Sequence, residues 1–235
     1  MTGATGLRAE WAALRRFLAA PRRLPRRHAP GHAWVLRALG FAAAVLAVNI
    51  ALGVLVLEPL AAWAGIHEEL PEALSLRFVL LGGLFAPLFE ELLLRAGLRR
   101  LDYALFIGPP LIVWAFGPGG PAWDRIAAGL ALGLLLVWLV QRWRWRGGAA
   151  RIASGRRFIR HYGWVYWGAA LAFALPHIGN YSWHGARGAA VVAMVLPQLL
   201  MGTVAGYLRL RDGLRSSLLM HFTNNAVALL LWERL

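Results

Sequence analysis

The chain has 235 residues, of which 59% are hydrophobic and 15% are charged, and its mean hydropathy is +0.55. Soluble domains are usually about half apolar and a quarter charged, so the composition predicts a polytopic membrane protein of one domain. No cysteine occurs, which excludes disulfides, thiol nucleophiles, iron–sulfur clusters and cysteine-ligated zinc. The net charge is +14, and every basic residue is arginine. Because the arginines cluster between apolar segments, contact with anionic lipid is favoured over binding to nucleic acid.

Residues 1–36 form a basic segment before the first long apolar stretch. Apolar residues recur at helical spacing among arginines, which is typical of a short amphipathic helix on a membrane surface; they are Leu7, Trp11, Leu14, Phe17 and Leu18. A disordered basic tail is the alternative. No apolar core and cleavage site follow at the distance expected of a signal peptide. We therefore expect this segment to lie on the cytoplasmic face.

About 20 apolar residues cross a bilayer as a helix, and on this rule the sequence predicts an all-α bundle of about seven to eight transmembrane spans. The spans that can be placed lie near 37–57, 77–98, 102–117, 122–141, 162–178, 187–208 and 215–232. The third is short and contains Pro109-Pro110, so it is either a kinked helix or half of a hairpin with the fourth.

Arginine placement predicts the orientation of these spans. Arginines occupy the N-terminal segment, the residues after the second and sixth spans, and the polar linker 142–160, whereas Glu58, Glu68, Glu69 and Glu72 lie on the other side. Because basic loops stay in the cytoplasm, seven spans place the N-terminus in the cytoplasm and the C-terminus outside.

Glycines four residues apart occur in two spans. The first pair is Gly129 and Gly133, in the fourth span, and the second is Gly202 and Gly206, in the sixth. Small residues at this spacing let helix backbones approach closely, so we expect both spans to pack tightly.

Two adjacent carboxylates, Glu90 and Glu91, interrupt a stretch from Phe78 to Leu94 that is otherwise apolar or small. A charge at the centre of a membrane helix costs about 3 kcal/mol or more, so two in succession need a reason. Adjacent helical residues point about 100° apart, which indicates that both cannot face one site. Glu91 lies four residues before Arg95, the favoured order for an ion pair. Glu90 is then left to face the bundle interior as a general base, unless both carboxylates pair with arginines at a helix end.

Two later apolar segments each carry a histidine with a partner four residues away. Phe173 and His177 would share one helix face, as would His221 and Asn225. The second pair could address one substrate carbonyl. A lone histidine near a helix end is usually a satisfied polar residue, but two histidines with an intramembrane glutamate favour an active site.

Motifs of other intramembrane proteases are absent from the sequence. His67-Glu68 lacks the second histidine of a zinc-binding HExxH helix. Asp212 is not preceded by the Gly-x-Gly of aspartyl intramembrane proteases, and Ser154 lacks the glycine-serine setting of rhomboid proteases. No internal repeat is evident, which disfavours a transporter that uses the same buried groups.

Three ordered motifs remain: Glu90-Glu91-x-x-x-Arg95, Phe173-x-x-x-His177 and His221-x-x-x-Asn225. They resemble those of the CPBP family, which comprises the CAAX prenyl endoproteases and bacteriocin-processing-type membrane proteins and is also called the Abi family. The resemblance covers residues 77–232, within a protease domain expected at 37–235. It implies a bundle of eight or nearly eight helices that hydrolyses a peptide bond within the membrane.

The resemblance also implies roles for the motif residues. The implied catalytic residues are Glu90, His177, His221 and Asn225, and the implied supporting residues are Glu91, Arg95 and Phe173. Glu90 and His177 would activate a water molecule. His221 and Asn225 would stabilise the oxyanion, where each donor is worth about 3 kcal/mol. Zinc held by Glu90, His177 and His221 is the alternative, but a metal-free mechanism is favoured because asparagine is a poor zinc ligand.

The implied substrate is a membrane-anchored protein or peptide, cleaved near its C-terminus in the lipid bilayer, and no nucleic acid is involved. A prenylated CAAX tail is the eukaryotic-type substrate. The lysine-free sequence looks bacterial, so we expect the bacterial cytoplasmic (inner) membrane and the processing of peptides or C-terminal sorting tails. A non-catalytic immunity or scaffold protein of the same fold is the alternative. The oligomeric state is not indicated.

Two features depart from the family pattern. Two predicted spans separate Glu91 from Phe173, although an even number of inserted spans preserves the direction of later helices. At ~1.5 Å per residue, Glu90 and His221 fall in the cytoplasmic half of the membrane and His177 falls near the opposite end of the fifth span. Either that span starts deeper, or the site lies nearer the middle of the membrane.

Overall fold

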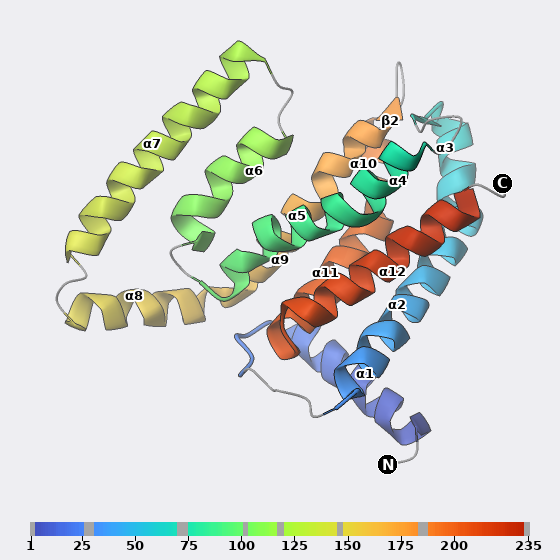
Figure 1. The fold of residues 1–235 in the computed structure, drawn as a ribbon, viewed down its shortest axis with the longest axis horizontal. Helices are drawn as coiled ribbons and strands as arrows, with labels where there is room; N and C mark the ends of the chain where they lie inside the picture. The colour runs from blue at the N-terminus through green and yellow to red at the C-terminus, as the bar shows by residue number, and fades with distance from the viewer. Residues whose placement is uncertain are drawn as a thin grey trace.

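The computed structural model describes residues 3–25, 31–69, 75–100, 103–116, 120–144, 148–182 and 188–232. Within these ranges the chain is almost wholly helical (Figure 1). Three helical stretches of the described residues are long and apolar enough to cross a membrane: Ala33–Ala64, Pro121–Trp143 and Ala189–Arg211. The all-α membrane fold is therefore confirmed, whereas the number of spans stays a prediction. Glu72 and residues 102, 117 and 187, which the predicted orientation and spans include, lie outside the described residues.

The helices follow one another with few breaks. The first part of the chain forms α1 (Gly3–Ala19), α2 (Ala33–Leu52), the π-helix η1 (Gly53–Leu57), α3 (Glu58–Ala64) and strand β1 (His67–Glu68). The middle forms α4 (Leu76–Leu80), the π-helix η2 (Leu81–Phe85), α5 (Ala86–Arg95), the 3₁₀-helix η3 (Ala96–Leu98), the π-helix η4 (Tyr103–Ile107), α6 (Gly108–Phe116), α7 (Pro121–Arg144) and α8 (Gly148–Arg160). The last part forms α9 (Tyr162–Ala174), the 3₁₀-helix η5 (Leu175–Asn180), strand β2 (Tyr181–Ser182), α10 (Gly188–Ala193), α11 (Leu196–Arg211) and α12 (Leu214–Trp232).

Each of these three π-helices ends two residues before a proline. The prolines concerned are Pro59 after η1, Pro87 after η2 and Pro109 after η4. Proline has no N–H and its ring clashes with the carbonyl four residues earlier, so a helix that continues through it must rearrange its hydrogen bonds, and a widened π turn is one solution. Within the described residues, the predicted spans 77–98 and 102–117 therefore contain helix that continues through its prolines.

Helix α11 lies at the centre of the bundle, where every residue from Met201 to Leu208 is buried. A Cβ on Gly202 would lie 2.8 Å from the ring of Phe173, and a Cβ on Gly206 would lie 3.1 Å from the ring of Tyr166. The predicted tight packing of this span is therefore confirmed, with α9 as the neighbour.

The same prediction is wrong for the fourth span within this chain. Among the residues that the structure describes, none from outside the helix lies within 4 Å of the position that a Cβ would take on Gly129 or Gly133. Figure 1 shows the reason: α6 and α7 form a hairpin that stands at one side of the bundle. The α6–α7 hairpin, which lies between α5 and α9 in the sequence, therefore does not prevent α5 and α9 from packing against each other.

The polar linker predicted at 142–160 is largely helix α8, which leads into α9 (Figure 1). Phe158 anchors it, because its buried ring lies 5.5 Å from the ring of Tyr162 at the start of α9. The linker is thus a helix that runs beside the bundle.

A two-stranded antiparallel ribbon holds the chain that follows α9. His67 pairs with Ser182 and Glu68 with Tyr181, and the Glu69 N–H donates to the Asn180 carbonyl at 2.8 Å. Burial raises the pKa of Glu68, and burial together with the nearby Glu68 charge raises the pKa of Tyr181 to about 12. The pairing of β1 with β2 fixes the end of η5, because Asn180 is the last residue of η5 and Tyr181 the first of β2.

Substitution of Gly202 by alanine should destabilise the protein by about 1–3 kcal/mol, because the added methyl group would overlap the Phe173 ring. Gly129→Ala is the matched control: its methyl group meets open space, and alanine favours helix by up to about 1 kcal/mol. Thermal unfolding in detergent, followed by tryptophan fluorescence, would measure both. Equal melting temperatures for the two variants would contradict the packing described for α11.

Candidate active site

The Glu91 carboxylate lies at the centre of the predicted site and is fully buried. Arg95, four residues later on α5, donates from Nη1 to Glu91 Oε1 at 2.5 Å, so the predicted ion pair is confirmed. His221 of α12 approaches the same oxygen, with its Nδ1 at 3.1 Å. Because a carboxylate only accepts hydrogen bonds, His221 carries a proton on Nδ1. Glu91 thus orients the His221 imidazole, and Arg95 compensates the negative charge of Glu91.

Glu90 faces the other nitrogen of the same imidazole. Its Oε2 lies 3.5 Å from His221 Nε2, and its side chain is 13% exposed. The expectation that adjacent glutamates cannot face one site is therefore wrong. The two nitrogens of an imidazole lie on different edges of the ring, so a histidine placed between two diverging side chains reaches both.

Phe173 connects the three motifs. Its buried ring lies under the Arg95 guanidinium, with 4.6 Å between Cζ and the ring centroid, a distance at which cation–π attraction operates. The same ring is 5.2 Å from the His177 ring and 5.4 Å from the His221 ring, measured between centroids. The bare backbone of Gly202 makes room for it. Phe173 therefore sets the relative positions of both histidines and the arginine.

His177 lies just past the end of α9, in η5, where Pro176 interrupts the helix. Its Nδ1 donates to the Phe173 carbonyl at 2.9 Å, and this leaves Nε2 as the free nitrogen of the neutral ring.

The expected offset in depth between His177 and His221 is absent, since both rings contact Phe173. Helix α9 has 13 residues and is therefore ~20 Å long, shorter than a hydrocarbon core of ~30 Å. Its C-terminal end can thus lie well inside the membrane.

Asn225, one turn after His221, donates from Nδ2 to the Gly82 carbonyl at 3.1 Å. The reason lies in η2: the Ala86 N–H donates to Leu81, five residues back, and Pro87 has no N–H to offer Gly82. The Gly82 carbonyl is left without a helical partner, and Asn225 supplies one. Sequence reasoning missed this contact, although a proline five residues after a glycine in an apolar helix was the available signal.

The structure thus brings the predicted residues together around two neighbouring rings, those of Phe173 and His221. Those joined by contacts are Glu90, Glu91, Arg95, Phe173, His177 and His221, and Asn225 follows on α12. In the described parts of the chain, no three His, Asp or Glu side chains are placed to hold a metal ion.

A model of the type II CAAX prenyl endopeptidase Rce1-like family matches residues 72–227, which include all three motifs. The chain belongs to this family. No curated protein and no solved structure matches it. The family match confirms the resemblance to the CAAX proteases. Together with the apolar helices, membership makes the chain an integral membrane protein of CAAX-type protease kind, whose substrate is a membrane-associated protein.

Replacing Arg95 with methionine should destabilise the protein by about 3–5 kcal/mol, because it leaves the buried Glu91 carboxylate uncompensated. The double variant Glu91→Gln/Arg95→Met removes both charges and should recover much of that loss. Arg15→Met, at an exposed arginine of α1, should change stability by less than about 0.5 kcal/mol. Melting temperatures in detergent would rank the three, and a double variant no more stable than Arg95→Met would argue against a buried, balanced pair.

Proposed function

We propose that the chain is a metal-independent, glutamate-type endopeptidase. It hydrolyses a peptide bond near the C-terminus of a membrane-anchored protein or peptide. The observation that carries the proposal is the position of His221, whose two nitrogens lie 3.1 Å from Glu91 and 3.5 Å from Glu90. A buried carboxylate behind an imidazole fixes its tautomer and stabilises its protonated form, and the second carboxylate can exchange a proton with it.

The reaction begins with Glu90 as the general base. A water molecule loses a proton to Glu90 while its oxygen attacks the substrate carbonyl carbon, and the carbonyl electrons move to form an oxyanion. His177 offers the lone pair of Nε2 to the second hydrogen of the water, because its Nδ1 proton is committed to the Phe173 carbonyl. These two groups together orient the nucleophile.

The oxyanion is stabilised from α12. Glu90 passes its proton to His221 Nε2, and the resulting imidazolium is stabilised by Glu91 and donates from Nε2 to the oxyanion. Asn225 uses one amide hydrogen on Gly82 and has a second for the oxyanion. As the intermediate collapses, the C–N bond breaks, the leaving amine takes a proton from His221, and the products are a carboxylic acid and an amine.

The substrate and setting rest on family membership and on the sequence. A membrane-embedded site suits a substrate that is itself anchored in the bilayer, and peptides or C-terminal sorting tails fit a bacterial cytoplasmic membrane. The basic segments, including α1 and α8, favour a cytoplasmic N-terminus. The same distribution of charge is the basis for dividing the chain into a basic N-terminal segment, residues 1–36, and a protease domain, residues 37–235.

Cleavage of a quenched library of C-terminal membrane peptides by the purified protein tests the mechanism. Glu90→Gln and His221→Ala should each lower kcat by about 10²–10⁴-fold, as expected for loss of general acid–base groups. Asn225→Ala should lower kcat by about 10²–10³-fold, as expected for one oxyanion donor. Asn224→Ala is the control, because that buried amide donates to the Met220 carbonyl of its own helix.

Two further measurements test whether the mechanism needs a metal and whether the variants are folded. Activity should persist in a strong chelator, whereas loss on chelation and recovery with zinc would refute a metal-independent mechanism. Melting temperatures of all four variants separate loss of catalysis from loss of fold. Full activity in Glu90→Gln would reject the general base named here.

A further inference from the structure

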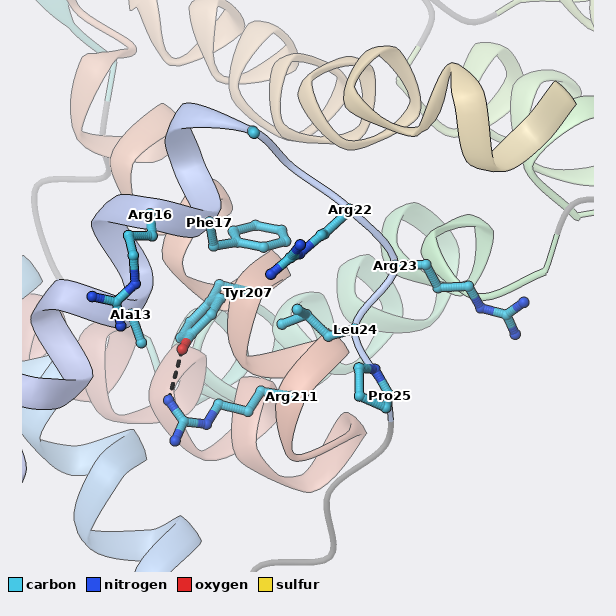
Figure 2. A pocket seen from close by; sticks show the side chains of 10 residues that line it. Ala13, Arg16, Phe17, Arg22, Arg23, Leu24, Pro25, Tyr207 and Arg211 are labelled. Carbon is cyan, nitrogen blue, oxygen red and sulfur yellow. Dashed lines mark hydrogen bonds between the residues drawn. The ribbon is translucent and has the colours of Figure 1, made fainter. Parts of the chain in front are cut away.

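A cavity of about 570 Å³, away from the candidate active site, lies between α1, residues 20–25 and the end of α11 (Figure 2). None of the proposed catalytic or supporting residues lines it. Four of the described residues around it are arginines and none is acidic; the arginines are Arg16, Arg22, Arg23 and Arg211. A concave surface with this lining requires an anion or carries an unbalanced positive charge.

Arg211 is already balanced by an ion-pair network beside the cavity. Glu10 of α1 accepts hydrogen bonds from both Arg211 Nη1 and Arg211 Nη2 and also pairs with Arg37. Arg37 in turn donates to both carboxylate oxygens of Asp212, at 2.8 and 2.7 Å. Two arginines and two carboxylates therefore neutralise one another. The positive charge that remains in the cavity belongs to the other arginines.

Arg16 and Arg22 have no such partners. No hydrogen bond or ion pair joins either guanidinium to another residue in the described part of the chain. In Figure 2, Arg22 points back toward Tyr207, whereas Arg23 points away, and Arg23 donates to the Arg99 carbonyl at 3.4 Å. Guanidinium groups bind phosphate oxygens through pairs of parallel hydrogen bonds, which makes arginine the preferred residue for phosphate.

Tyr207 adds a neutral donor to the same wall. Its hydroxyl accepts a hydrogen bond from Arg211 Nη1 at 2.7 Å, so the hydroxyl proton remains available for an anion.

Part of the cavity lining is apolar. Phe17 and Leu24 line it, and the buried Phe17 ring contacts Tyr166 at 4.8 Å and Tyr207 at 5.2 Å between centroids. Arginines together with apolar side chains in one cavity match the boundary of a phospholipid, where phosphate meets hydrocarbon.

We propose that this cavity binds a phosphate group, held by Arg16, Arg22 and the Tyr207 hydroxyl, as carried by an anionic phospholipid. Bound phosphate would fasten α1 to α11, since Arg16 belongs to α1 and Tyr207 to α11. Lipid composition would thereby control the stability of the bundle.

The test uses the full chain, purified in neutral detergent and titrated separately with phosphatidylglycerol, phosphatidylcholine and inorganic phosphate. Native mass spectrometry counts bound lipid, and tryptophan fluorescence gives the melting temperature. The variant is Arg16→Gln/Arg22→Gln. The matched control, Arg8→Gln/Arg15→Gln, removes the same charge from exposed positions of α1 that do not line the cavity.

We expect saturable binding of phosphatidylglycerol and a higher melting temperature, with the Kd at least about tenfold weaker in Arg16→Gln/Arg22→Gln and unchanged in the control. Inorganic phosphate acting equally well, with the same dependence on the variant, would support the site with free phosphate as its ligand. An equal loss of affinity for phosphatidylglycerol in both double variants would show that binding depends only on general surface charge, and it would overturn the proposal. So would the absence of saturable binding, or equal binding of phosphatidylcholine. Unliganded melting temperatures of the two double variants confirm that each is folded.

Discussion

The buried negative charge of Glu91 is the constraint on which the rest of the site depends. Such a charge is strongly unfavourable in an apolar bundle unless opposite charge and hydrogen bonds surround it. Arg95 and His221 meet that need from two helices, and Phe173 holds the guanidinium from a third. The requirements of the buried charge thus draw α5, α9 and α12 together, and Gly202 of α11 makes room for the aromatic ring that completes the arrangement.

Proline is the second influence on the architecture. In lipid, every backbone polar group must find a partner within the protein, so a proline in a span creates a carbonyl that something else must satisfy. At Pro87 the consequence is the π-helix η2 and a Gly82 carbonyl without a helical partner, to which Asn225 of α12 donates a hydrogen bond. A helix irregularity therefore fixes the position of a side chain beside His221. The same feature that disturbs α5 helps to align the two helices that carry the proposed chemistry.

Much of this could be predicted from the sequence, because each motif follows helix geometry. The Glu91–Arg95 pair and the shared face of Phe173 and His177 need only a spacing of four residues. The convergence of Glu90 and Glu91 on one ring could not be predicted, because it depends on where a residue 130 positions away inserts. Nor could the packing of glycines, since Gly129 and Gly202 have the same local pattern and differ only in whether a neighbouring helix is present.

The insertion between the first and second motifs shows why their order matters more than their spacing. Helices α6 and α7 pair with each other at one side of the bundle, so they occupy no place that α9 requires (Figure 1). Tyr166 and Phe173 lie seven residues apart and meet Gly206 and Gly202, which lie four apart, so two close contacts hold α9 against α11 whatever precedes it. His177 is then carried to Phe173 and His221 by the end of α9 alone. An active site assembled from helix ends and glycine-lined contacts can tolerate a long insertion, provided that the inserted helices return the chain to the side it left.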